Sequence, residues 1–460
     1  MVLLVPSVCL PSLRAEAAQD DPIVVSADHP RLFLRPARLR LLKRERERTS
    51  MRWQQFETLI AGNAPMPEPG FARALYYAIS GNAEFAKSAI AWALGPSGTD
   101  LHQLSLVYDW CLPAMSETQQ HDLAARMLKR MAETAADDSI PAVRSRVLAA
   151  VALFDEVPQI PQRELERTVN QWWKTKIVAP LLAGRDVIPR DDSYALMELL
   201  HALRDTTNLD LRESAAAFFK EFPIEHLMTY YPAAFPGAEN EYYIGMEPKA
   251  VEPNTQVAAL SRVADLAMVA FDVNAPETQV LQGWLMHDKF LLRSTLGSPY
   301  EFLWANPYQP GLSYYHVPLI YYNPEYGRLF MRSSWEDTAI WFGHFDGVMQ
   351  LFSEGRVNMI SAKQMAAPVS VGEAMVCFGQ NGLKYQLSLN DEDAVFVVGL
   401  EPKQTYRVEV DDEEMFEAAS DRAGILHLAD VPRGKPVGVR LAKADPIGAA
   451  TVTERSPHNL

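Results

Sequence analysis

Positive charge is scarce in this 460-residue sequence. Lys and Arg total 43 against 58 Asp and Glu, which gives a formal net charge of −15. Proteins that bind nucleic acid neutralise its phosphates with clusters of basic residues, so no nucleic-acid partner is expected. The same imbalance disfavours an acidic polysaccharide, unless a cleft gathers Arg and Lys locally.

Cysteine and long apolar runs are scarce too. The three cysteines are Cys9, Cys111 and Cys377. We expect Cys9 to be removed with an N-terminal segment. The other two pair only if the fold brings them together, and we expect two separate buried thiols. Beyond the N-terminal segment no apolar run is long enough to cross a bilayer, so no membrane span is predicted.

Residues 1–20 resemble a truncated secretory signal. An apolar run extends from Val2 to Leu13, and Ala15-Glu16-Ala17 supplies the small residues of a cleavage site. The basic residues that normally precede such a run are missing. We expect a periplasmic or secreted protein, with a disordered apolar tail as the alternative.

Residues 21–298 show helical periodicity. FARALYYAISGNAEFAKSAIAWALG predicts a helical hairpin that breaks at Gly81-Asn82 and ends at Gly95. In SETQQHDLAARMLKRMAE, Ser116 and Gln119 form a capping box. Roughly ten to twelve helices in pairs, without a fixed repeat length, predict an α/α toroid (an incomplete barrel of helical hairpins) rather than an open superhelix.

The pattern changes near Pro299. YEFLWANPYQPGLSYYH is rich in aromatic residues, Pro and Gly, so residues 299–311 are expected to form an irregular linker. From residue 312 to 448, runs such as RLFMRSS, AIWFGHF and TYRVEVDD alternate with period two between turn sequences. They predict an antiparallel β-sandwich of two packed sheets, followed by a frayed tail at 449–460.

Several stretches resemble the heparinase II/III-like polysaccharide lyases, in which a helical toroid precedes β-sheets. HPRLFLRPARLRLLKRE is similar to that family's entry segment, and LVYDWCLPAMSETQQ to one of its helix junctions. NQWWKTKIVAPLL resembles a tryptophan helix on the sugar-facing side of the toroid, and GRLFMRSSWEDTAIWF the hairpin that opens the β domain. The resemblance implies a polysaccharide or oligosaccharide partner and β-elimination of a uronate-containing polysaccharide.

Two positions depart from the family's pattern. Its β-domain strand usually carries H-x-H-x-D, whereas here the first histidine position is Phe342, followed by His344 and Asp346. The acidic or amide residue that usually precedes the Ile of the tryptophan helix is Lys176. These departures bear on whether the chain is catalytic at all.

A lyase of this kind removes the proton at C5 of a uronic acid and expels the sugar at C4. It needs a base such as Tyr or His, and a group that stabilises the negative charge developing on the carboxylate. The segment Tyr230–Lys249 gathers candidates in an irregular link, where active-site residues often lie. Asn240, Tyr242 and Tyr243 are the predicted catalytic residues there, and Glu239 and Glu241 the predicted substrate-binding ones. The alternative is an aromatic loop that packs over the toroid rim.

His344 completes the predicted catalytic set. His344 and Asp346 stand two apart in a predicted strand, so both side chains are expected on one face. Asp346 would then orient the imidazole toward the toroid cleft, and a solvated strand face is the alternative. A metal site needs a third ligand, and the neighbouring strand offers no His or Cys. We predict no metal and no cofactor.

Tryptophans are the predicted sugar platforms. Trp172 and Trp173 are adjacent, so on one helix they cannot both face the core. We expect one of them to stack on a sugar ring or on the β domain. Trp304, in the aromatic-rich segment after Pro299, is the third candidate for substrate binding.

Three functions are compatible with these patterns. The first is a polysaccharide lyase acting on a uronate-containing glycan. The second is a glycoside hydrolase on a helical toroid, with Glu239 or Glu241 and Asp191 as acid and base. The third is a non-catalytic relative that binds a glycan through an aromatic cleft.

Overall fold

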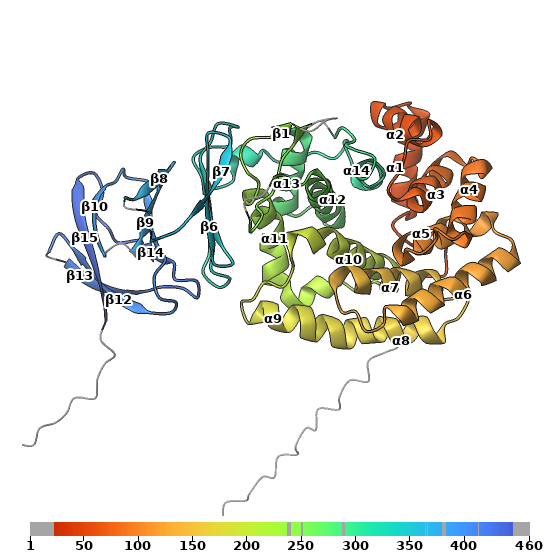
Figure 1. The fold of residues 1–460 in the computed structure, drawn as a ribbon, viewed down its shortest axis with the longest axis horizontal. Helices are drawn as coiled ribbons and strands as arrows, with labels where there is room; N and C mark the ends of the chain where they lie inside the picture. Colours follow the sequence, from red (N-terminus) through yellow and green to blue (C-terminus); the bar gives the residue numbers. More distant parts are fainter. Residues whose placement is uncertain are drawn as a thin grey trace, which may run out of the picture.

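The computed structural model describes residues 23–236, 241–249, 252–287, 290–363, 365, 367–379, 383–412 and 414–444. The predicted signal segment and the predicted tail lie outside the described residues. A helical region comes first and antiparallel β-sheets follow, which confirms the predicted fold class (Figure 1).

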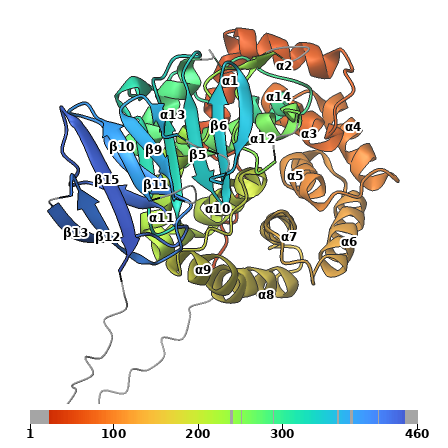
Figure 2. The same ribbon diagram turned by 60° about the vertical axis from the view of Figure 1, so that its left-hand side comes forward.

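The helices follow one another in a curved array (Figure 2). The α-helices are α1 (Pro36–Glu47), α2 (Met51–Ala61), α3 (Pro69–Ser80), α4 (Ala83–Leu94), α5 (Leu101–Cys111), α6 (Glu117–Glu133), α7 (Ile140–Ala152), α8 (Gln159–Arg167), α9 (Ala179–Leu182), α10 (Ser193–Thr207), α11 (Ala216–Met228), α12 (Thr255–Phe271), α13 (Pro276–His287) and α14 (Gly297–Trp304). A π-helix, η2 (Thr168–Val178), joins α8 to α9, and the 3-10 turns η3 (Arg190–Asp192) and η4 (Leu211–Ala215) precede α10 and α11.

Local signals in the sequence set several helix ends as predicted. Gly81 closes α3 in the left-handed conformation, with φ of 73°, and Asn82 caps α4 through a hydrogen bond from the backbone N–H of Glu84. At the start of α6, Ser116 and Gln119 make the reciprocal bonds of a capping box. These ends depend on neighbouring residues alone.

Helix α14 corrects the predicted irregular linker. Residues Gly297–Trp304 are helical and buried, and α14 packs on α12, α2 and α3. Arg52 donates from Nη2 to the carbonyl of Glu301 at 2.8 Å, and Arg38 donates from Nη1 to the carbonyl of Trp304 at 2.6 Å. The aromatic residues that looked like a loop signal therefore pack against the first helices and link the end of the array to its beginning.

The described strands form three large sheets and a two-stranded ribbon of β1 (Phe235–Pro236) and β2 (Glu241–Tyr242). The first sheet is β3 (Ile320–Asn323), β4 (Arg328–Arg332), β5 (Trp341–Phe345), β6 (Val348–Ser353) and β7 (Arg356–Ile360) in that order. The second has the order β14 (Leu426–Leu428), β11 (Ala394–Val398), β9 (Ala374–Phe378) and β8 (Val369–Val371), with β9 and β11 parallel. The third has the order β10 (Lys384–Ser388), β15 (Pro436–Lys443), β12 (Thr405–Val410) and β13 (Glu414–Ala419).

The sheets stack as three layers beside the helices rather than the two that were predicted (Figure 1). Phe330 and Trp341 of the first sheet belong to the core shared with the helices, and Trp341 donates from Nε1 to the carbonyl of Met228 at 2.8 Å. The opposite face of that sheet packs on the second sheet, which in turn packs on the third. Period-two alternation in the sequence shows which residues lie on each face of a strand. It does not show how many sheets pack against one another.

The remaining predictions on this part of the chain concern cysteines and membranes. Cys111 in α5 and Cys377 in β9 are buried and free, as predicted. Among the described residues no helix is long and apolar enough to cross a bilayer.

Candidate functional site

A cleft of about 560 Å³ lies between the helices and the first sheet. Its walls come from the segment 186–193, from α11, from the segment 246–249 and from the end of β5. Gln350 of β6 fixes one wall, because it donates from Nε2 to the carbonyl of Glu247 at 2.6 Å and accepts a hydrogen bond from Tyr231 Oη at 2.8 Å. The cleft therefore has the size and rigidity of a small-molecule site.

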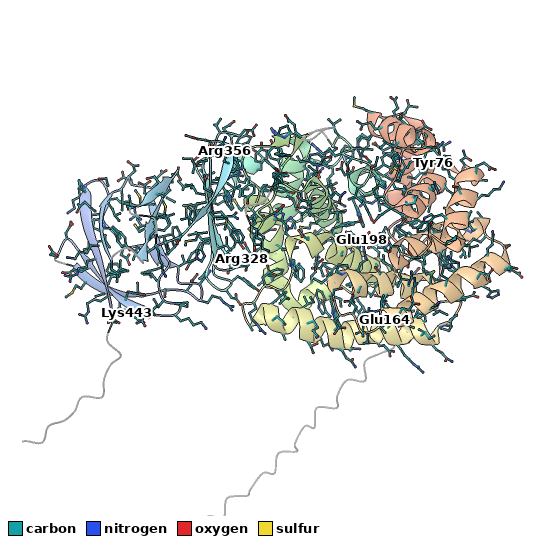
Figure 3. The ribbon with its side chains drawn as sticks, viewed as in Figure 1. Tyr76, Glu164, Glu198, Arg328, Arg356 and Lys443 are labelled. Carbon is teal, nitrogen blue, oxygen red and sulfur yellow. The ribbon has the colours of Figure 1, made fainter. Side chains whose placement is uncertain are left out.

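Three carboxylates surround one guanidinium in this cleft. Arg328 Nη1 lies 2.7 Å from Asp186 Oδ2 and also donates to Glu225 Oε1, while Arg328 Nη2 lies 3.6 Å from Asp346 Oδ2. Figure 3 shows Arg328 at the junction of the first sheet and the helices. The side chain of Asp186 is 4% exposed and that of Asp346 is 60% exposed.

This arrangement keeps a proton on one carboxyl up to about pH 6. A single positive charge cannot balance three negative ones, and the most buried carboxyl is the most costly to ionise. Burial, opposed by Arg328 and reinforced by Glu225, raises the pKa of Asp186 to about 6. The cleft thus pairs a carboxyl group whose pKa is raised, Asp186, with a solvent-accessible one, Asp346.

His344 and Asp346 do not share a strand face, which corrects the predicted orienting pair. Strand β5 ends at Phe345, and Asp346 and Gly347 form a two-residue turn with φ of 49° and 76°. This turn directs Asp346 to Arg328 on the helical side. His344 pairs with Leu329, whose side chain packs between the first and second sheets, and burial lowers the pKa of His344.

A buried histidine network lies behind the cleft. His226 of α11 donates from Nδ1 to Asp265 Oδ1 at 2.5 Å, and Tyr230 donates from Oη to Asp265 Oδ2 at 2.5 Å. Ser193 Oγ lies 3.3 Å from His226 Nε2. Burial and the neighbouring Arg190 lower the pKa of His226, against the effect of Asp265, so His226 is neutral at pH 7.

Tyr243 lies in a second, aromatic pocket of about 190 Å³. Its ring is inclined at 62° to that of Trp284, with the ring centroids 4.7 Å apart, and its hydroxyl lies 3.4 Å from Asp337 Oδ1. Tyr314 and His287 line the same pocket, with Tyr314 Oη 3.4 Å from His287 Nδ1. The rings of Trp284 and Tyr314 are buried, and Tyr315, which is 52% exposed, offers the aromatic surface that suits the apolar face of a sugar ring.

Arg332 lies against this aromatic pocket. Its Cζ is 4.1 Å from the ring centroid of Trp335, which lines the pocket. The side chain is buried, and among the described residues its Nε and Nη1 have no hydrogen-bond partner. Burial, against Tyr314 and Tyr243, lowers the pKa of Arg332 to about 10, so it remains a cation at pH 7.

The three predicted sugar-binding tryptophans are buried, which corrects their assignment. Trp172 donates from Nε1 to the carbonyl of Asp138 at 2.9 Å, and Trp173 donates from Nε1 to Ser214 Oγ at 2.8 Å. Different elements cover two sides of the η2 helix, so adjacent residues are both enclosed. Trp304 donates from Nε1 to Tyr194 Oη at 3.0 Å and is enclosed with α14.

The other predicted residues are divided between the ribbon and the segments outside the described residues. Tyr242 is buried in β2, and the exposed Glu241 accepts a hydrogen bond from Arg293 Nε at its carbonyl, 2.8 Å away. Glu239 and Asn240 lie outside the described residues. Asp191, predicted for the hydrolase alternative, does line the cleft.

Asp186, Glu225 and Arg328 were missed by the sequence reasoning. Strand β4, RLFMR, is buried along its whole length although it begins and ends with Arg. A buried Arg in such a strand calls for hydrogen-bond acceptors from another element, which Arg328 finds in carboxylates. That signal indicates that partners exist, but it does not identify them.

Comparisons with known proteins add little. No family model matches the chain, and no curated protein matches it. A solved structure described as "Glycoside hydrolase" aligns with 82% of this chain and 71% of its own, at 11% sequence identity and a TM-score of 0.31. This similarity is too low to carry an argument about activity, and the resemblance to heparinase II/III-like lyases stays a prediction.

Proposed function

We propose that this protein is a carbohydrate-active enzyme that hydrolyses a glycosidic bond in the cleft between the helices and the first sheet. The observation that carries the proposal is the pairing of Asp186, whose pKa is raised to about 6, with an accessible Asp346 on the two terminal nitrogens of Arg328. A glycoside hydrolase needs one carboxylic acid and one carboxylate whose environments hold them in different protonation states.

Each residue then has a separate task. Asp186 donates its proton to the glycosidic oxygen as the C1–O bond breaks. Asp346 takes a proton from the water that attacks C1, so the products are two free sugars and the two carboxyl groups have exchanged protonation states. Arg328 holds both carboxyl groups in place and stays charged throughout.

The charge of the cleft favours a neutral glycan. Asp186, Asp191, Glu225, Glu247 and Asp346 line it against three cationic side chains, Arg190, Lys249 and Arg328. A uronate entering here would add another negative charge to a lining in which carboxyl groups outnumber cations, which costs free energy. The predicted export of the protein to the periplasm or medium is part of this proposal.

The test is release of reducing ends from a panel of neutral and uronate-containing polysaccharides. We expect Asp186→Asn and Asp346→Asn each to lower turnover at least about 100-fold, the usual size of an acid–base contribution. The matched control is Glu392→Gln, an exposed carboxylate in the turn before β11. Full turnover in both cleft variants would refute the proposal.

A polysaccharide lyase acting at the aromatic pocket is the second candidate. Arg332 favours it, because a buried guanidinium with two unpartnered nitrogens suits the carboxylate of a uronate as negative charge develops on it. Tyr243, as the phenolate, would take the C5 proton. The C5–H electron pair would form the 4,5 double bond as the C4–O bond breaks, and the phenol would return the proton to the departing oxygen. Only this reaction produces an ultraviolet-absorbing unsaturated sugar end.

The product separates the two candidates. Reducing ends without the unsaturated chromophore support hydrolysis, and the chromophore supports elimination. Tyr243→Phe should abolish elimination and leave hydrolysis unchanged. Asp186→Asn should abolish hydrolysis and leave elimination unchanged. Glycan binding without either product would leave a non-catalytic binding protein.

A further inference from the structure

A second cluster of titratable side chains lies inside the helical array, away from the cleft. Glu68 directly precedes α3, while Asp100 and His102 lie at the start of α5. One ligand atom from each of the three residues lies within 4.8 Å of the other two. Figure 3 shows Glu198, which contacts this cluster, within the helices and apart from Arg328.

We propose that Glu68, Asp100 and His102 bind a divalent transition-metal ion such as Zn²⁺ or Mn²⁺. The set combines one imidazole nitrogen with two carboxylate oxygens, which suits these ions. Ca²⁺ prefers oxygen ligands alone, so the histidine disfavours it. The proposal goes beyond glycan cleavage and does not depend on it.

The surroundings of His102 are those of a metal ligand. The side chain is 2% exposed, and its Nε2 lies 3.2 Å from Glu198 Oε1. Glu198 is itself held by Arg144 and by Tyr194, whose hydroxyl donates to Glu198 Oε1 at 2.6 Å. Metal-binding histidines commonly donate their second N–H to a carboxylate, which fixes the ring and its tautomer. Here that leaves the Nδ1 lone pair for a metal.

Both carboxylates are fixed as well. Tyr300 donates from its hydroxyl to Glu68 Oε2, and Gln103 donates from Nε2 to Asp100 Oδ2 at 3.1 Å. Among the described residues neither carboxylate forms an ion pair with Lys or Arg. Two carboxylates this close repel each other, and a divalent cation between them removes the repulsion.

The role of such an ion is structural. It would join the starts of α3 and α5, near Tyr300 of α14, which brings three parts of the helical array together. An ion that binds the folded chain and not the unfolded one stabilises the folded state by mass action. Three protein ligands leave coordination positions for water.

The test uses the full chain after treatment with a chelator and dialysis. Titration with Co²⁺, followed by visible absorption and by calorimetry, should show one ion bound per chain, and Zn²⁺ should compete where Ca²⁺ does not. Zn²⁺ should also raise the melting temperature. His102→Gln and Glu68→Gln should weaken Co²⁺ binding at least about tenfold, in the range that loss of a ligand produces.

Two further variants keep the result interpretable. Asp100→Asn removes the charge but keeps a side chain that caps α5 equally well, so it should fold and bind Co²⁺ more weakly. His121→Gln changes a histidine that is 73% exposed and remote from the cluster, and it should bind as wild type does. Absence of Co²⁺ binding in the wild type, or unchanged binding in Asp100→Asn and His102→Gln, would overturn the proposal, whatever the outcome of the glycan assays.

Discussion

Replacing Asp186 by Asn should separate stability from activity in this protein. Asn has one side-chain oxygen where Asp186 uses two, Oδ2 toward Arg328 and Oδ1 to accept from the backbone N–H of Ile188. The substitution therefore removes the ionisable proton and also one of these two acceptors. The variant should carry the constant cost of the lost contact, lose the proposed proton donor, and no longer undergo the change in stability that Asp186 causes as the pH rises.

The size and sign of that change follow from the environment of Asp186. Its pKa is about 6 in the folded protein, against about 3.9 for an unburied Asp. Ionising it in the folded state thus costs about 3 kcal/mol more than in the unfolded chain. Between about pH 4 and pH 6 Asp186 holds more protons in the folded chain than in the unfolded one, so its contribution to stability falls through this interval and levels off above it.

Chemical unfolding at several pH values from 4 to 8 measures the effect. All other titrating groups are common to the two proteins, so the difference in unfolding free energy between variant and wild type isolates Asp186. We expect this difference to shift by about 2 kcal/mol in favour of Asp186→Asn between pH 4 and pH 7, because part of the unfolded-state titration is already complete at pH 4. A difference that stays constant, or that increasingly favours the wild type as the pH rises, would mean that Arg328 outweighs burial. The pKa of Asp186 would then not be raised, and Asp186 could not be the proton donor.

Three further outcomes are expected. Arg328→Met leaves Asp186 and Glu225 buried without their cation. It should lower the free energy of unfolding by about 3–5 kcal/mol at pH 8 and by less at pH 5. Equal losses of stability at the two pH values would contradict the charge argument. Gly347→Ala, at φ of 76° with no atom within 4 Å of the new Cβ, should cost about 1 kcal/mol in denaturant unfolding, through conformation alone. His344→Ala should lower stability by about 1–3 kcal/mol but keep the rate of glycan cleavage within about twofold of wild type. Loss of turnover at unchanged substrate affinity would instead show that His344 takes part in catalysis.

The fold class and many element ends were predictable from the sequence. Gly81 and Asn82 end one helix and begin the next because a left-handed glycine and an asparagine cap act within a few residues. The alternation of RLFMR and WFGHF predicted strands for the same local reason. Helix α14 was not predicted, because its Pro and aromatic residues are typical of a loop. They form a buried helix only because α2 and α3 cover them.

The site was less predictable, because it depends on which faces meet. His344 and Asp346 stand two apart, yet the turn at Asp346-Gly347 sends one to Arg328 and leaves the other between sheets. Trp172 and Trp173 are both enclosed because separate elements cover two sides of their helix. No spacing in the sequence reveals these partners.

The sequence by itself determined the order of helices and strands, since capping and side-chain periodicity act over a few residues. Only the tertiary structure decided that Asp186, Glu225 and Asp346 share Arg328, since these residues come from elements far apart in the chain. The proton on Asp186 has the same origin. Its pKa is set by burial and by neighbouring charges, and both exist only once the helices and the first sheet have packed together.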